Sequence, residues 1–112
     1  MPKTPSRIQQ KPHLVVIWEF HVDPRKRGPF ERAYGSRGTW AKFFQGSEGY
    51  IRTELIRDVN SPNRYFTLDY WRSGRHYEMF RKMHRDSYLE IDRKCETLTT
   101  KETEIGRFRI NP

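Results

Sequence analysis

The sequence contains very little cysteine and no long apolar run. Cys95 is the one cysteine among 112 residues, so no internal disulfide can form, which is the usual situation in a reducing compartment. No stretch of about 18 apolar residues is present, which argues against a membrane-spanning helix. The first residues, Met1 to Arg7, lack the apolar core of a secretory signal. We therefore expect a cytoplasmic protein with no membrane partner.

The charge is strongly positive, but it is not concentrated in one place. Lysine and arginine number 22 against 14 aspartate and glutamate residues, which gives a net charge of +8. A nucleic-acid-binding protein gathers its basic residues into a patch or stripe. Here they are spread from Lys3 to Arg109 among acidic residues, and only Arg25–Arg27 forms a run. This distribution is typical of a solvated surface and predicts no nucleic-acid partner.

The first half of the chain divides into an arm, two strands and an interrupted helix. Residues 1–13 contain three prolines and no periodicity, so we expect a flexible N-terminal arm ahead of a domain at 14–112. Residues 14–22 alternate as a strand does. Helical spacing follows through 30–44, but Gly35 and Gly38 predict a broken helix, with Thr39 capping its second half. Residues 50–58 alternate again, and the loop at 60–63 predicts a hairpin to a third strand.

The hydrophobic period changes within residues 64–98. Residues 64–72 alternate aromatic and β-branched side chains, which predicts a strand covered on both faces. Ser73 is a suitable helix cap, and the large residues then recur every three or four positions from Tyr77 to Leu98. One helix of this length is too long for the domain, so we expect a break near 85–87. Residues 104–110 predict a short last strand.

This order of elements predicts an α+β fold. A βαββαβ chain folds naturally into a ferredoxin-like unit, a four-stranded antiparallel sheet with the helices on one face. The strands carry apolar residues on both faces, so the second face needs a cover. An identical sheet from a second subunit would provide one, and we therefore expect a homodimer.

Several segments spread over nearly all of the predicted domain form a recognisable pattern: Val16–Pro24, Phe30–Glu31, Gly49–Tyr50, Thr53–Leu55, Tyr65–Trp71, the helix with Tyr77, Phe80 and His84, and Ile105–Gly106. In these segments the sequence resembles the antibiotic biosynthesis monooxygenase-like family of dimeric α/β barrels. The family contains cofactor-independent oxygenases of aromatic polyketides, haem-degrading enzymes, small isomerases and members without known activity. The resemblance implies a small-molecule ligand and, for the oxygenases, no cofactor.

The haem-degrading branch matches this sequence only in part. That branch has a tryptophan at the end of the third strand, which Trp71 matches, and a histidine ligand on the next helix, for which His84 is the nearest candidate. It also has an asparagine in the first strand, where this sequence has Trp18, and its histidine falls about half a turn earlier. Haem degradation is therefore the less favoured interpretation.

Two residues could act as a general base, Asp69 and His84. Asp69 lies in a strand covered on both sides, where desolvation raises a carboxyl pKa unless an arginine pairs with it. His84 lies on the apolar stripe of the second helix, where it is either a hydrogen-bonded core residue or a base. We expect both near one cavity. The candidate substrate-binding residues around them are Trp71, Tyr77, Trp18, Tyr65 and His76.

Each of these side chains also has a purely structural interpretation, and aromatic residues are more often core than pocket. The histidines and Cys95 show no metal-ligand spacing, so we expect no metal site. No nucleophile motif of a hydrolase is present. Two hypotheses remain: a cofactor-independent monooxygenase or isomerase acting on an aromatic or enolisable substrate, and a non-catalytic domain that binds a small ligand or serves in assembly.

Overall fold

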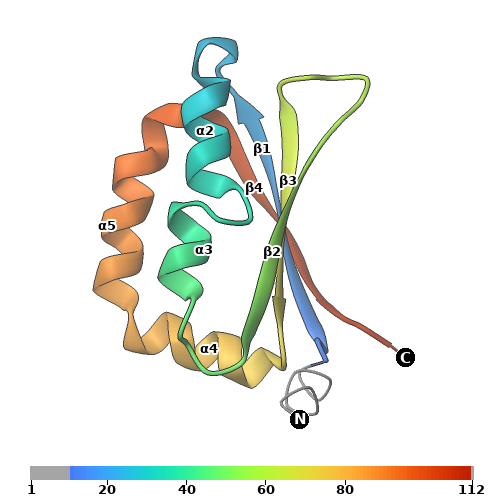
Figure 1. Cartoon of the computed structure of the whole chain (residues 1–112), viewed down its shortest axis with the longest axis vertical. Coiled ribbons are helices and arrows are strands. Elements are labelled where there is room, and N and C mark those ends of the chain that lie inside the picture. Colours follow the sequence, from blue (N-terminus) through green and yellow to red (C-terminus); the bar gives the residue numbers. More distant parts are fainter. Residues whose placement is uncertain (1–10, 112) are drawn as a thin grey trace, which may run out of the picture.

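The structure is a computed structural model, and it describes residues 11–111; residues 1–10 of the predicted arm lie outside them. The chain forms one sheet and a layer of helices (Figure 1). The strands are β1 (Leu14–Val22), β2 (Tyr50–Arg57), β3 (Arg64–Trp71) and β4 (Thr99–Arg109). The helices are α2 (Arg27–Tyr34), α3 (Thr39–Phe44), α4 (Gly74–Met83) and α5 (Arg85–Cys95), with short 3-10 turns η1 (Pro24–Lys26) and η2 (Glu96–Leu98).

The sheet has the strand order β2-β3-β1-β4, and each neighbouring pair is antiparallel. All the helices lie on one side of it, the left side in Figure 1. This is the predicted ferredoxin-like arrangement of a four-stranded sheet with its helices on one face. The hairpin between β2 and β3 is also confirmed.

The core lies between this sheet face and the helices, and it is mostly aromatic. Along β3, buried residues alternate with partly buried ones, and the side chains of Tyr65 and Trp71 are fully buried on the face that the helices cover. Phe30 on α2 stacks on Tyr34 with ring centroids 4.4 Å apart and packs against Tyr65 at 4.8 Å. Removing one such buried ring costs about 3–5 kcal/mol. The alternation along the strands therefore fixes which side chains can reach a site inside this layer.

The first predicted helix is broken, as expected, into α2 and α3. A side chain at Gly38 would place its Cβ 2.3 Å from the backbone oxygen of Arg32, so only glycine fits there. The prediction that Thr39 caps α3 is wrong, because Gly38 is the capping residue and no side chain contributes a cap hydrogen bond. The turn between the two helices is tight at Gly38, whose backbone N–H donates to the carbonyl oxygen of Gly35 at 2.9 Å.

The second predicted helix is also broken, and its cap is confirmed. Ser73 Oγ accepts a hydrogen bond from the backbone N–H of His76 at 3.2 Å. The break falls at His84, one residue before the predicted region, where the backbone leaves the helical conformation at φ −120° and ψ 32°. The helices α4 and α5 therefore run in different directions over the sheet.

The last strand begins earlier than predicted. The sequence predicts this strand over residues 104–110, but β4 extends from Thr99 to Arg109 and pairs along the whole of β1. The physical reason is that Thr99 lies opposite Val22, so pairing starts where β1 ends. A register shift between Ile17 and Trp18 marks a bulge in this pair.

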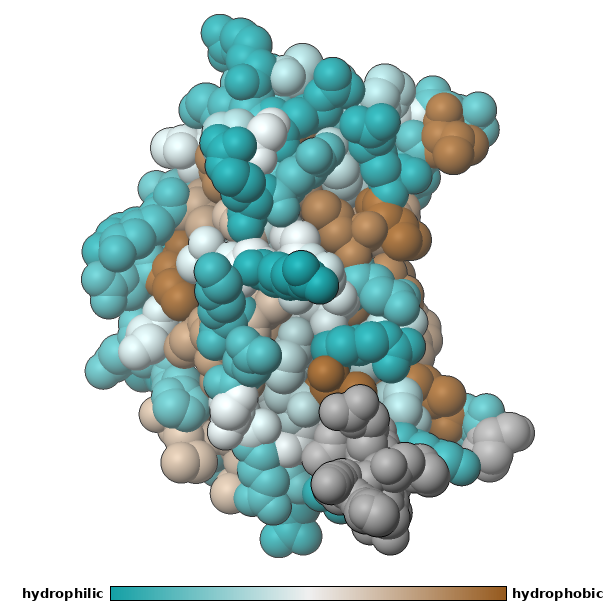
Figure 2. Space-filling model, in the orientation of Figure 1, coloured by the Kyte–Doolittle hydropathy of each residue, from teal (hydrophilic) through white to brown (hydrophobic). Residues whose placement is uncertain are grey.

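No helix of residues 11–111 lies on the other face of the sheet. Its exposed apolar side chains include Ile56, Ile105 and Phe108. Figure 2 shows hydrophobic residues along the hollowed right-hand side, where the bare sheet lies. A bare apolar sheet face of this kind usually marks an interface. Within residues 11–111, no helix is both long and apolar enough to cross a membrane.

Candidate functional site

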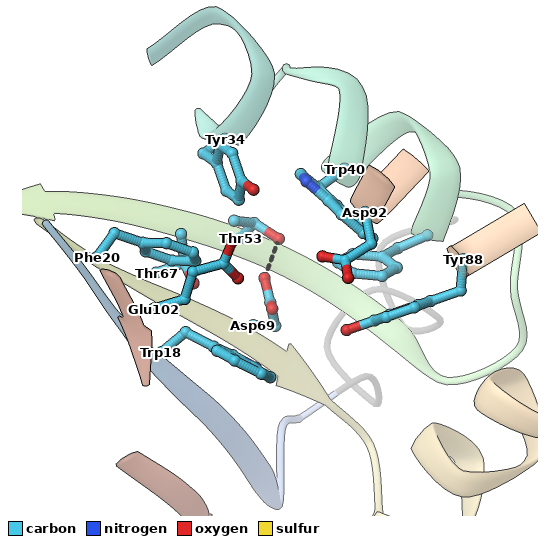
Figure 3. A pocket seen from close by; sticks show the side chains of 11 residues that line it. Trp18, Phe20, Tyr34, Trp40, Thr53, Thr67, Asp69, Tyr88, Asp92 and Glu102 are labelled. Atoms are coloured by element: carbon cyan, nitrogen blue, oxygen red, sulfur yellow. Dashed lines mark hydrogen bonds between the residues drawn. The ribbon is translucent and has the colours of Figure 1, made fainter. Parts of the chain in front are cut away.

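A small cavity lies between the helix-covered face of the sheet and the helices α2, α3 and α5 (Figure 3). Its volume is about 40 Å³. This is room for about three or four water molecules at about 10–15 Å³ each. The lining residues are Trp18, Phe20, Tyr34, Trp40, Phe44, Thr53, Thr67, Asp69, Tyr88, Asp92 and Glu102.

Asp69 forms the floor of the cavity. Its side chain projects from β3 toward the helices, and the residue is only 8% exposed (Figure 3). Thr53, its partner across the β2–β3 pair, donates a hydrogen bond to Asp69 Oδ1 at 2.7 Å. The hydroxyl of Tyr50 lies 2.8 Å from Thr53 Oγ1 and can donate to it, which completes a chain of hydroxyl groups leading to the carboxylate.

Burial raises the pKa of Asp69 to about 7, and the hydrogen bond from Thr53 opposes that rise only in part. No arginine of the described residues lowers this pKa. The sequence allows two alternatives for Asp69: an ion pair with an arginine, or a desolvated carboxyl group without one. The structure gives it Thr53 as its hydrogen-bond partner and no ion pair within residues 11–111. A carboxyl group with a pKa near neutrality can both accept and return a proton.

Two further carboxylates lie at the mouth of the cavity. Asp92 comes from α5 and Glu102 from β4, and both residues are exposed. Partial burial and repulsion from Asp92 raise the pKa of Glu102, which accepts one hydrogen bond from Thr99 Oγ1 at 3.2 Å. The cavity therefore has a buried carboxyl group at its floor and two carboxylates at its rim.

Aromatic rings form the walls. Trp40 meets Tyr88 edge to face at 5.0 Å and Tyr34 at 6.1 Å, so α2, α3 and α5 each contribute one ring. Trp18 closes the sheet side, stacked beside Phe20 at 6.3 Å. Burial raises the pKa of the Tyr34 and Tyr88 hydroxyls, which keeps both phenols protonated and able to donate hydrogen bonds.

Of the residues predicted for a site, Asp69 and Trp18 line this cavity. Trp71, Tyr77 and Tyr65 are core residues instead. Trp71 is completely buried and meets Tyr77 edge to face at 5.4 Å, while the Tyr65 hydroxyl donates to Glu31 Oε2 at 2.5 Å. The structural interpretation therefore accounts for the contacts of these three aromatic residues.

The two predicted histidines do not reach the cavity. His84 and His76 line a separate surface hollow of about 380 Å³, together with Met79 and Met83. His84 is exposed at the break between α4 and α5, with its ring 4.9 Å from that of Phe80. His76 Nδ1 lies 2.7 Å from Ser73 Oγ, within the helix cap. The expectation that His84 is a core residue, or that it shares a cavity with Asp69, is not met.

Sequence reasoning missed most of the polar residues of the cavity. Thr53 could have been found, because extending the predicted hairpin register places it opposite Asp69. Asp92 and Glu102 carry no local signal, since Asp92 comes from α5 and Glu102 from the part of β4 that precedes the predicted strand at residues 104–110. Asp92 reaches the cavity through the packing of α5 over the sheet, and Glu102 reaches it through the pairing of β4 with β1.

The cavity does not match a haem or a metal centre. Within residues 11–111, no three histidine, cysteine, aspartate or glutamate side chains are arranged to hold a metal ion. His84, the predicted haem ligand candidate, lies in the other hollow. A volume of about 40 Å³ is also far below the roughly 300–1,000 Å³ of typical pockets for cofactors and drug-sized ligands.

Residues 13–85 match the family model described as antibiotic biosynthesis monooxygenase. The chain belongs to this family. Solved structures share the fold: SnoaB, a cofactor-independent oxygenase from Streptomyces nogalater, is 19% identical with a TM-score of 0.64, covering 91% of this chain and 96% of its own. A conserved protein from Methanosarcina mazei Go1 is 20% identical with a TM-score of 0.68, covering 93% and 98%. A Bordetella bronchiseptica protein is 16% identical with a TM-score of 0.69, covering 91% and 100%.

At this level of identity, the likeness to the solved structures of this family shows the fold alone. No curated protein sequence matches the chain. The family match ends at residue 85, before Tyr88, Asp92 and Glu102. The cavity therefore combines residues from the matched region with three residues that lie outside it.

Proposed function

We propose that this family member is a cofactor-independent enzyme that removes a proton from a small enolisable substrate and, in its oxygenase form, passes the resulting carbanion to molecular oxygen. The observation that carries the proposal is Asp69, a carboxyl group with a pKa of about 7 that faces an aromatic-lined cavity. The fold shared with SnoaB, a cofactor-independent oxygenase, supports the oxygenase form.

The chemistry requires one base and some hydrogen-bond donors. Asp69 takes a proton from a carbon next to a carbonyl group, and the electrons of that C–H bond form the enolate. The hydroxyls of Tyr34 and Tyr88 and the indole N–H of Trp40 are donors that line the cavity and can stabilise the enolate oxygen. Thr53 holds one oxygen of Asp69, which leaves the other to act as the base.

Oxygenation follows from the enolate without any other reductant. The enolate carbon supplies both electrons to molecular oxygen and forms a C–O bond, giving a peroxide anion. Asp69 returns its proton to the peroxide. Loss of water then leaves a new carbonyl group, so that a CH₂ group and O₂ become a C=O group and H₂O. The protein supplies a base, donors and an enclosed volume.

Deuterium exchange tests the base directly. Acetone and butanone are enolisable probes without a ring, which suits the small volume of the cavity, and NMR in deuterated water at neutral pH follows the loss of their C–H signals. We expect the wild-type protein to accelerate exchange of at least one probe, and Asp69→Asn to lose about a hundredfold or more of that acceleration. An oxygen electrode then shows whether oxygen is consumed. Equal exchange in the wild type and Asp69→Asn would refute the proposal.

A matched control is available on α5. Asp86→Asn removes one carboxylate from an exposed position that does not line the cavity, and it changes the net charge as Asp69→Asn does. This variant should keep the wild-type exchange rate. A loss in both variants would trace the effect to net charge and not to the cavity.

The small volume of the cavity supports a second candidate, binding of a small ligand without chemistry. About 40 Å³ holds only part of a ring-sized ligand, because a cavity of about 150 Å³ is what accommodates benzene. The same experiment separates the two. Binding of a probe with no exchange above the Asp69→Asn rate would favour the non-catalytic function.

We also propose that the chain works as a cytoplasmic homodimer. The support for the dimer is the bare sheet face, where Ile56, Ile105 and Phe108 are exposed. The ion pair between Arg64 and Glu19 at 2.6 Å lies on the same face and would be partly desolvated by a second sheet. The support for the compartment is Cys95, which is a buried free thiol.

A further inference from the structure

Asp69 is hydrogen-bonded through one oxygen only, and the group that binds it comes from β2. Thr53 lies opposite Asp69 in the β2–β3 pair and donates to Asp69 Oδ1 at 2.7 Å (Figure 3). Both residues are buried, Thr53 at 3% and Asp69 at 8% exposed. Within residues 11–111, no other hydrogen bond reaches this carboxyl group. The state of Asp69 therefore depends on how the Thr53 hydroxyl is held.

The single hydrogen atom of a hydroxyl group fixes the direction of the next hydrogen bond along the chain. While Thr53 donates its hydrogen to Asp69, it can only accept from Tyr50, whose hydroxyl lies 2.8 Å from Thr53 Oγ1. Hydrogen bonds in such a chain polarise one another, so the donation from Tyr50 strengthens the donation from Thr53. Tyr50 therefore influences a carboxyl group to which it is not itself bonded.

An irregularity in β2 brings the two hydroxyl groups together. The register of the β2–β3 pair shifts between Tyr50 and Arg52, so Ile51 is an extra residue in β2. In a regular strand, residues 50 and 53 would point to opposite faces, because side chains alternate. The extra residue places Tyr50 opposite Trp71, on the helix-covered face that also holds Thr53. Bulges of this kind occur next to active sites, where they redirect a side chain.

The ring of Tyr50 is held in place by packing. It meets the ring of Phe44 at 5.5 Å and that of Trp71 edge to face at 5.3 Å. Partial burial raises the pKa of the Tyr50 hydroxyl, so this group stays protonated and able to donate at neutral pH. The change Tyr50→Phe keeps the ring, and it therefore removes the hydroxyl without removing these contacts.

We propose that Tyr50 is a positioning residue for Asp69 and acts on it through Thr53. Its donated hydrogen bond keeps Thr53 donating to Oδ1, so that a proton taken from a substrate resides on the other oxygen of the carboxyl group and can be returned from there. A hydrogen bond to the charged form also opposes the desolvation of the carboxylate. The inference rests on the proposed function, because it gives Tyr50 a part in the proton transfer assigned there to Asp69.

Other titratable groups also lie close to Asp69, and they are the same in every variant used below. None of them, within residues 11–111, donates a hydrogen bond to the carboxyl group. They are Tyr34 from α2, Tyr77 from α4, Tyr88 and Asp92 from α5, and Glu102 from β4. A change in Asp69 that follows from Tyr50→Phe is therefore assigned to the chain of hydroxyl groups.

The pKa of Asp69 can be measured directly in the full chain. Carbon NMR of protein labelled at its aspartate carboxyl groups follows the titration, and Asp69→Asn identifies the signal. Tyr50→Phe should raise this pKa by about 0.3 unit or more, because neighbouring hydrogen bonds strengthen one another by about 10–30%. Thr53→Val should raise it by about one unit or more, because the carboxylate loses the donor seen in the described chain. Thr53→Ser keeps a hydroxyl and should stay near the wild type.

A matched control removes a tyrosine hydroxyl from the other face of the sheet. Tyr70 on β3 donates to Glu54 Oε1 at 3.1 Å and does not line the cavity. Tyr70→Phe should leave the pKa of Asp69 unchanged.

The pH profile of deuterium exchange from butanone gives a second measurement. The exchange rate should rise with pH as Asp69 loses its proton, and the midpoint should move upward in Tyr50→Phe by the same amount as the pKa measured by NMR. A general loosening of the structure would lower the rate without moving the midpoint in step with that pKa.

An unchanged pKa of Asp69 in Tyr50→Phe would overturn the inference, as would an equal rise in Tyr70→Phe. An exchange midpoint that stays in place while the wild type is active would overturn it too. These outcomes are separate from those of the enolisation test. If the wild type exchanges no probe while Tyr50→Phe still raises the pKa of Asp69, only the proposed chemistry is refuted, because the chain of hydroxyl groups then acts on Asp69 without that reaction.

Discussion

Replacing Asp69 by asparagine should stabilise the protein, and by more at high pH than at low pH. Its carboxyl pKa is about 7 in the folded chain against 3.8 ordinarily. Between these values the folded state holds a proton that the unfolded state has released, so the free energy of unfolding falls as pH rises from about 4 to about 7. At about 1.4 kcal/mol per pKa unit, this destabilisation is about 2 kcal/mol at pH 5 and about 4 kcal/mol at pH 8.

Asp69→Asn removes this ionisation while keeping the size of the side chain and an oxygen that can accept from Thr53. Any change in packing or hydrogen bonding is the same at both pH values, so the comparison between them isolates the ionisation. The gain in Tm should be larger at pH 8 than at pH 5 by about 10 °C, given about 4 °C per kcal/mol for a domain of this size. Thermal melts followed by circular dichroism at constant ionic strength provide the measurement.

The matched control for this experiment is Asp86→Asn, which removes an exposed carboxylate on α5. Its effect on Tm should be small and nearly equal at the two pH values. An equal gain for Asp69→Asn at pH 5 and pH 8 would refute the reasoning, because the folded and unfolded chains would then bind the same number of protons at this position.

Three further predictions concern the fold. Light scattering should give about twice the chain mass of 13.6 kDa, and Leu68→Glu on the bare sheet face should give the monomer; a monomeric wild type would contradict the dimer. Ser73→Ala should cost about 1 kcal/mol in denaturant unfolding, because α4 loses its cap, and no loss would argue against that cap. His84→Ala should shift Tm by no more than about 2 °C because the residue is exposed, whereas Phe80→Ala beneath it should cost about 3–5 kcal/mol.

The fold could be predicted from the sequence because the hydrophobic spacing of a strand or a helix is set by residues close together in the chain. The change from alternation to helical spacing after Ser73 marks the end of β3 and the start of α4, and glycines mark the division of the first helix. The start of β4 was missed because Thr99–Thr103 carries no apolar alternation. Its pairing depends on contact with β1, a neighbour far away in the sequence.

The site was predicted less well than the fold, and the reason lies in where helices break and pack. Asp69 and Trp18 were found because alternation in β3 and β1 places them on the helix-covered face. His84 follows the spacing of Tyr77 and Phe80, but the helix ends at this residue, so the spacing no longer predicts its direction. Asp92 joins the site only because α5 packs across the sheet after that break.

The predicted cost of Asp69 to stability is an argument for the proposed function. If Asp69 served only to accept the hydrogen bond from Thr53, an asparagine oxygen would do so without the cost of burying a carboxylate. The chain pairs most of its other carboxylates with cations, yet leaves this one and the two at the rim without such a partner in the described residues. Departures from local stability rules tend to occur at functional sites. The packing around Asp69 would be served as well by a neutral side chain, and this is why we propose that its carboxyl group acts on a molecule that enters the cavity.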